Sequence, residues 1–180
     1  EDAIQAAVEE RLAASSLPVS PASLALLEEA YGAAMAVINR ETFEGCAAWR
    51  DDPRLGADVA KRLRAAGQTT DVELRDAEAL RRAFITEVDR LLETHDVLAL
   101  PTLPHAPLTR AAAEAGQQDL TISALLRPFN LSGHPALTLP LAPRAGYPLA
   151  LQLVGRRGDD AGLCRVARLL ARAPRANAPD

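Results

Sequence analysis

Lysine is almost missing from this chain. Lys61 is the only lysine among 180 residues, and every other basic side chain is arginine or histidine. A mechanism that needs a catalytic lysine must therefore use Lys61 or a residue outside this chain. Lys61 lies beside Arg62 and Arg64 on the polar face of a predicted helix, whereas a catalytic lysine is desolvated so that its pKa falls. The pattern predicts that Lys61 is a surface residue.

Cysteine and histidine are also scarce, and neither occurs at the spacing of a metal site. Cys46 and Cys164 fit reduced thiols better than a disulfide framework. His95, His105 and His134 lack ligand spacing. We expect His95 to be a surface cap and the other two to be solvated loop residues, with a place in a pocket as the alternative. The sequence also lacks a Gly-rich phosphate loop and a Gly-x-Ser-x-Gly motif, so it predicts no metal and no cofactor.

Excess positive charge and long apolar runs are absent as well. The formal net charge is −4, which argues against a nucleic-acid partner. No apolar run approaches the roughly 20 residues of a membrane span, and the N-terminus lacks the features of a signal peptide. These absences predict a cytoplasmic protein without a membrane partner. Because the first residue is not Met and lies in a predicted helix, we expect a segment of a longer polypeptide.

The sequence predicts one domain over residues 1–180. The pattern of apolar residues divides this domain into two parts. The first part, 1–95, is expected to be mainly helical, with apolar residues at helical spacing in the segments 3–14, 20–49, 54–66 and 71–93. Ser20 and Pro21 are typical of a helix start. Thr70 and Glu73 form a capping-box pattern, in which each side chain satisfies a free backbone N–H.

The second part, 96–172, predicts strand, loop, strand, strand and helix. Its apolar runs at 96–100, 136–139 and 149–154 are typical of buried strands. A short helix is expected at 121–127, a final helix capped by Asp159 follows, and 173–180 should form a frayed tail. This order indicates an α/β fold with a partial mixed sheet flanked by helices. Three strands make a small sheet, so we expect partner strands from elsewhere or a covered edge.

A polar turn at 130–135 precedes the strand at 136–139. Gly133 can adopt a positive φ, and Pro135 fixes its own φ and favours an extended His134. A bend at the mouth of a buried strand is a frequent place for a binding loop in α/β folds. The alternative is a purely structural turn that leads into a core strand.

Three segments carry a family resemblance. Residues 96–107 read Asp-Val-Leu-Ala-Leu-Pro-Thr-Leu-Pro-His-Ala-Pro, residues 129–140 read Phe-Asn-Leu-Ser-Gly-His-Pro-Ala-Leu-Thr-Leu-Pro, and residues 146–155 read Gly-Tyr-Pro-Leu-Ala-Leu-Gln-Leu-Val-Gly. In this order they resemble motifs of the amidase signature family, over roughly 20–172. The resemblance implies the C-terminal portion of an amidohydrolase that cleaves carboxylic amide C–N bonds on a mixed sheet wrapped in helices.

The resemblance also implies what this chain lacks. The family uses a Ser–Ser–Lys triad from its N-terminal part, and Lys61 matches no triad position, so we assign no catalytic residue and expect the chain alone to be inactive. The positions that face the acyl group in relatives correspond here to Ser123, Leu126, Asn130, Leu131, Ser132, Gly133 and His134. Glutamine-specific relatives tend to carry Asp where Ser123 falls, which favours a general amidase.

The implied partner is a small amide substrate, bound together with the missing N-terminal part, and homo-oligomerisation is left open. Two alternatives remain at this point. One is a non-catalytic binding or assembly module that retains the amidase scaffold. The other is an unrelated small α/β domain whose loops match by chance.

Overall fold

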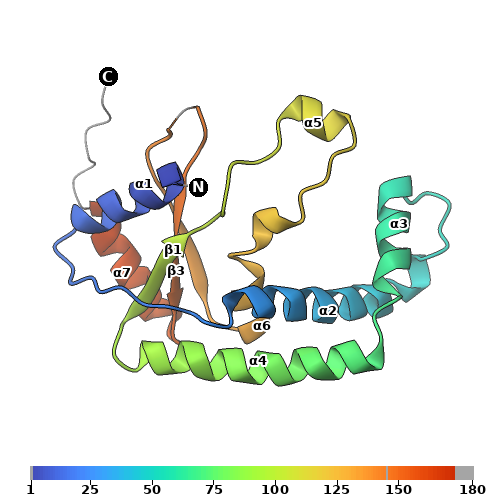
Figure 1. Cartoon of the computed structure of the whole chain (residues 1–180), viewed down its shortest axis with the longest axis horizontal. Coiled ribbons are helices and arrows are strands. Elements are labelled where there is room, and N and C mark those ends of the chain that lie inside the picture. Colours follow the sequence, from blue (N-terminus) through green and yellow to red (C-terminus); the bar gives the residue numbers. More distant parts are fainter. Residues whose placement is uncertain (1, 145, 173–180) are drawn as a thin grey trace.

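The computed structural model describes residues 2–144 and 146–172 and shows helices around a small sheet (Figure 1). Its α-helices are α1 (Asp2–Ala13), α2 (Leu27–Gly45), α3 (Ala57–Ala66), α4 (Asp71–Leu92), α5 (Arg110–Glu114), α6 (Arg127–Ser132) and α7 (Asp160–Arg172). Two 3-10 turns, η1 (Ala47–Trp49) and η2 (Thr121–Ser123), and three strands, β1 (Val97–Pro101), β2 (Ala136–Pro140) and β3 (Ala150–Gly155), complete the described elements. The predicted frayed tail at 173–180 lies outside the described residues.

The three predicted strands pair side by side in the order β1-β3-β2, and both pairings are antiparallel. Val154 of β3 lies opposite Leu98 of β1 and Ala136 of β2, and Gln152 lies opposite Leu100 and Thr138. The central strand β3 has neighbours on both edges and is buried along most of its length. The expected α/β class, with helices flanking a small sheet, is confirmed.

Helices cover the two faces of the sheet from opposite sides (Figure 1). Leu151 and Leu153 of β3 pack in one core against α1 and α7, where Val8 and Leu170 are buried. The alternate residue Val154 packs in a second core with α2, α4 and α6. Period-two alternation of side chains along β3 produces this division, so a single strand contributes to both cores.

The start of α2 differs from the prediction. The helix begins at Leu27, not at Ser20, and its first residues receive no local side-chain cap. Instead the Glu87 carboxylate of α4 accepts hydrogen bonds from the backbone N–H groups of Ala25 (2.6 Å) and Leu26 (3.1 Å). A distant carboxylate thus satisfies donors that a local cap would otherwise serve. Ser20 Oγ lies 2.9 Å from His95 Nε2 instead.

Two local caps agree with the sequence. Thr70 Oγ1 accepts from the Glu73 backbone N–H, and the Glu73 carboxylate accepts from the Thr70 backbone N–H, which completes the capping box of α4. Asp159 accepts from the Gly162 backbone N–H (2.9 Å) at the start of α7. In α3 the apolar residues at helical spacing are not all buried: Leu63 is buried, but 42% of Val59 is exposed.

The expected burial of the two outer strands is also wrong. In β1 only Leu98 is buried, and β2 has alternating exposed and half-buried residues. Each of these strands has a single neighbour, β3, so one edge of each is free within the described residues. An apolar sequence run indicates a strand, but only its place in the sheet decides how much of it is buried.

Candidate functional site

The predicted turn at 130–135 is in fact the end of a helix. In place of the helix expected at 121–127, the structure has the 3-10 turn η2 and then α6, which begins at Arg127. Pro128 lies in the first turn of α6, where its missing N–H costs no hydrogen bond. The helix continues through Asn130 and ends at Ser132. Gly133 then adopts φ +73°, as predicted, and its N–H donates to the Phe129 carbonyl (2.9 Å). A glycine in the left-handed region closes α6 and directs the chain into β2.

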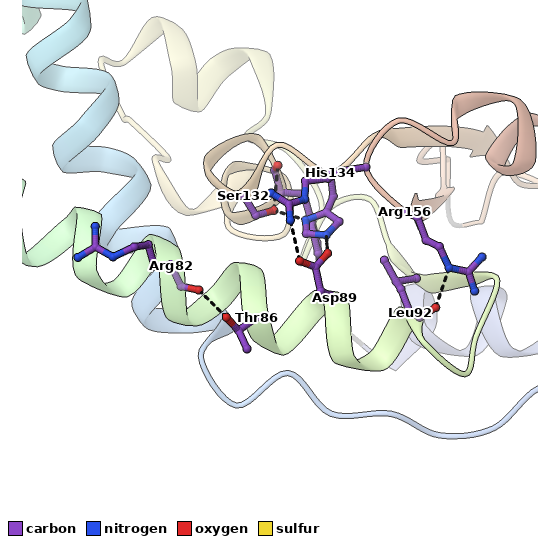
Figure 2. Close-up of polar contacts among 9 residues, drawn as sticks. Arg82, Thr86, Asp89, Leu92, Ser132, His134 and Arg156 are labelled. Atoms are coloured by element: carbon purple, nitrogen blue, oxygen red, sulfur yellow. Dashed lines mark hydrogen bonds and ion pairs between the residues drawn. The ribbon is translucent and has the colours of Figure 1, made fainter.

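His134 is enclosed beside this helix end, so the expectation of a solvated loop histidine is wrong. Its side chain is 0% exposed. Nε2 lies 3.0 Å from Asp89 Oδ1 of α4, and Nδ1 lies 2.9 Å from Ser132 Oγ (Figure 2). Because a carboxylate oxygen only accepts, Nε2 carries the proton toward Asp89. The residue therefore joins α6 and β2 to α4.

A cation on the opposite side completes the network. Arg157, in the turn after β3, donates from Nη2 to Asp89 Oδ2 (2.7 Å), so each Asp89 oxygen has one partner. Burial lowers the pKa of the His134 imidazole below its ordinary value. The Asp89 carboxylate opposes this shift, and the Arg157 charge adds to it. A neutral imidazole that carries its proton on Nε2 accepts a hydrogen bond from the Ser132 hydroxyl at Nδ1.

The order Ser132, His134, Asp89 resembles a nucleophile, a base and an orienting carboxylate, but its geometry does not serve that chemistry. Ser132 is only 2% exposed, and its hydroxyl also lies 3.2 Å from the Phe129 carbonyl, within its own helix. A nucleophile must reach a substrate carbonyl, whereas this hydroxyl is enclosed. The three residues can instead hold the end of α6 at Gly133 in place. Gly133 itself is exposed.

The segment before α6 is held by two further contacts. Arg127 Nε donates to Ser123 Oγ (2.6 Å), which links the start of α6 to η2. Gln152 of β3, 1% exposed, donates from Nε2 to the Leu125 carbonyl (2.8 Å). Leu126 is half-buried between these contacts. Ser123 and Leu126 are therefore fixed relative to both the sheet and α6.

Asn130 and Leu131 contribute to a different feature, a shallow hollow of about 140 Å³ between α2, α4 and α6. Among the predicted site residues, these two line the hollow. Ser132 and His134 belong to the buried network, and Gly133 lies at the end of α6. The structure thus divides the seven predicted residues: two line the hollow, two belong to the buried network, Gly133 ends α6, and Ser123 and Leu126 lie in the segment before α6.

Sequence reasoning missed four residues of this region, namely Asp89, Arg127, Gln152 and Arg157. Gln152 carried a usable signal, because a lone amide inside an apolar strand needs a buried partner. Asp89 and Arg157 carried none, since each lies among other charged residues in the sequence. Their role depends on a tertiary contact with His134.

The remaining polar residues of the sequence analysis lie outside this region. Lys61 is exposed on α3, as predicted. His95 Nδ1 lies 2.8 Å from the Leu91 carbonyl near the end of α4, as expected of a cap, but the residue is half-buried and not on the open surface. His105 Nε2 contacts Thr121 Oγ1 (3.1 Å). Within residues 2–144 and 146–172, no group of histidine, cysteine and carboxylate side chains could hold a metal ion.

Comparisons with known proteins agree on one family. The Amidase family model matches residues 11–164. Amidase 1 of Oryza sativa subsp. japonica is 34% identical over 121 residues, which cover 66% of this chain and 28% of that protein. Fatty acid amide hydrolase of Oryza sativa subsp. indica is 30% identical over 117 residues, which cover 61% of this chain and 19% of that protein.

Solved structures give the same result for the fold. An amidase crystal structure superposes with a TM-score of 0.80 at 28% identity and covers 96% of this chain, but only 42% of the amidase chain. The chain therefore spans less than half the length of these relatives. No helix in the described part of the chain is long and apolar enough to cross a membrane.

Proposed function

Because this chain belongs to the amidase family, we propose that it is the C-terminal portion of an amidohydrolase that cleaves carboxylic amide C–N bonds. In this proposal the chain supplies scaffold and one wall of the substrate pocket, and the Ser–Ser–Lys triad comes from polypeptide outside it. The match over residues 11–164 carries the proposal. The single lysine, exposed on α3, supports the assignment of the triad to another segment.

The proposed pocket wall runs from Ser123 to His134. Its parts have different tasks in this proposal. Ser123, Leu126, Asn130, Leu131 and Gly133 face the substrate, whereas Ser132 and His134 hold that surface against α4 through Asp89. The exposure of Asn130 and Gly133 and the place of Leu131 in the lining of the hollow support this division, since Ser132 and His134 are buried and do not line the hollow.

The proposed partners are a small amide substrate and the polypeptide that carries the triad. The free edges of β1 and β2 support an assembly in which further strands extend the sheet, because unpaired strand edges are sites of backbone pairing. Such strands could belong to the same polypeptide or to a second chain. The proposed location is the cytoplasm, and homo-oligomerisation remains compatible with the proposal.

Activity measurements on the chain with and without the upstream part of its gene test the proposal. We expect no hydrolysis of a simple aryl or aliphatic amide by residues 1–180 alone, and measurable hydrolysis by the protein that includes the upstream part. Lys61→Arg in that longer protein serves as the control and should retain full activity. Turnover by the 180-residue chain, or loss of activity in the Lys61→Arg protein, would contradict the assignment of the triad.

A non-catalytic binding or assembly module that retains the amidase scaffold is the second candidate, because the only lysine of the sequence, Lys61, lies exposed on α3. The upstream gene sequence separates the two functions. A Gly-Gly-Ser-Ser-type loop together with an upstream lysine favours the enzyme, and their absence favours the module.

A further inference from the structure

The hollow between α2, α4 and α6 has a mixed chemical character. Val37 and Ile38 of α2 and Leu131 of α6 form apolar walls, while the side chains of Arg81, Arg127 and Glu41 supply the charge. Two guanidinium groups and one carboxylate leave a net charge of +1 in this lining. A concave surface with apolar walls and a few charged groups is typical of small-molecule sites.

Among the described residues, Arg127 is held in place without a counter-ion. Its Nε donates to Ser123 Oγ at 2.6 Å, which fixes the plane of the guanidinium. In the part of the chain that the structure describes, its two Nη groups have no hydrogen-bond or ion-pair partner within contact distance. The residue as a whole is half-buried. A fixed guanidinium of this kind is suited to an incoming anion.

Arg81 of α4 is only loosely engaged. Its Nη1 lies 3.4 Å from Glu78 Oε1, and both side chains are 39% exposed. An exposed ion pair of this length contributes little to stability, so an anion in the hollow could draw the Arg81 guanidinium from Glu78 at small cost. The hollow therefore offers one fixed and one adjustable cationic group.

We propose that this hollow binds a small monocarboxylate with a short apolar body. Its volume of about 140 Å³ is comparable to a cavity that admits a benzene-sized molecule, which sets the size of the ligand. The Arg127 Nη groups bind the carboxylate, and the apolar body packs against Val37 and Leu131. Glu41 disfavours ligands with a higher negative charge, because a second anionic group would lie near its carboxylate.

This inference rests in part on the proposed function, because Asn130 and Leu131 belong both to the hollow and to the proposed pocket wall, but its test is separate from turnover. Binding is measured on the 180-residue chain, without the triad and without turnover. A failure of amide hydrolysis therefore leaves the inference unaffected, and a failure of carboxylate binding leaves the proposed function unaffected.

Titration of the chain with 3-methylbutanoate at low ionic strength and pH 7.5, followed by ¹⁵N chemical shifts, tests the site. We expect saturable shifts at residues of α2 and α6 around the hollow. Arg127→Gln should weaken binding at least about tenfold, since it removes a charge-assisted hydrogen-bond pair. Arg81→Gln should weaken it by a smaller factor. Glu41→Gln should tighten it, because the change removes a like charge.

Arg82→Gln is the matched control, since it removes the same charge from the neighbouring exposed position of α4, which does not line the hollow. It should bind like the unmodified chain. The neutral isostere 3-methylbutanamide, titrated into the unmodified chain, provides a test that needs no variant and should bind at least about tenfold more weakly. Equal affinity for acid and amide, or equal weakening by the Arg127 and Arg82 changes, would overturn the proposal.

Discussion

His134 shows how strongly one side chain depends on its tertiary surroundings. In the sequence it follows a glycine and precedes a proline, which favoured a solvated turn. In the structure it lies between α4 and the end of α6, with both ring nitrogens paired. Asp89, which accepts the hydrogen bond of the buried Nε2–H, is 45 positions away in the sequence. No local pattern could have identified the pair, because the contact exists only once α4 packs beside α6.

The burial of His134 predicts acid sensitivity. Its pKa is lowered on folding, so the unfolded chain binds the proton more readily than the folded chain between the two pKa values. The contribution of neutral His134 to the free energy of unfolding should therefore be fully present above about pH 6.5 and fall as the pH decreases through the folded pKa. One titrating proton limits the slope to about 1.4 kcal/mol per pH unit.

Urea denaturation between pH 5.0 and 8.0 measures this effect. His134→Asn should flatten the dependence around pH 6, while His105→Asn, a change in the Pro-rich loop, should leave it as in the unmodified chain. Identical pH profiles for the unmodified and His134→Asn proteins would rule out His134 as the source.

Asp89 should contribute to stability through His134. Asp89→Ala leaves the buried Nε2–H without an acceptor and frees the Arg157 guanidinium. A buried unpaired donor costs about 1–3 kcal/mol, so the free energy of unfolding should fall by about that amount in urea denaturation. Asp76→Ala, an exposed position on the same helix, is the control and should change stability by less than about 0.5 kcal/mol. Equal effects of the two changes would contradict a stabilising contact between Asp89 and His134.

For single helices, the sequence predicted the start correctly where the capping side chain is close to that start along the chain. The capping box at Thr70 and the Asp159 cap of α7 both occur at the predicted residues, because each needs only a side chain and a backbone group three residues apart. The start of α2 was misplaced because its cap, Glu87, belongs to another helix. Ser20 and Pro21 were the best local candidates for the helix start. The helix begins later, at Leu27, because α2 packs on α4 and receives its cap from Glu87.

The capping box gives a prediction for α4. Thr70→Ala removes the acceptor for the Glu73 N–H and should lower the free energy of unfolding by about 1 kcal/mol. Thr69→Ala, one residue earlier and outside the capping box, should have less than half this effect. Thermal or urea denaturation of the two variants measures the difference, and equal values would mean that the cap contributes nothing.

The whole molecule is organised around β3, the strand that packs against both helical layers. Leu151 and Leu153 contact the α1–α7 side, and Val154 contacts the α2–α4–α6 side. Figure 1 shows this strand between the two groups of helices, with α5 extending away from them. Loss of β3 pairing would therefore separate the two cores.

Amide hydrogen exchange should follow this arrangement. Backbone N–H groups of β3 that bond to β1 or β2 should exchange only on global unfolding, whereas those of α5 should exchange through local opening. Measured by NMR or mass spectrometry, protection should fall in the order β3, then α4, then α5. Protection of α5 equal to that of β3 would contradict a molecule held together by the central strand.

Residue order alone was sufficient for the helix–strand sequence, the two local caps, the left-handed Gly133 and the family resemblance, since each depends on neighbours within a few positions or on short motifs. The burial of His134, its pairing with Asp89, the long-range cap of α2 and the exposure of β1 and β2 arose only when distant segments packed. The reason is physical. Backbone preferences and side-chain periodicity act over one or two turns, whereas desolvation and the partners that offset it are set by which elements meet in space.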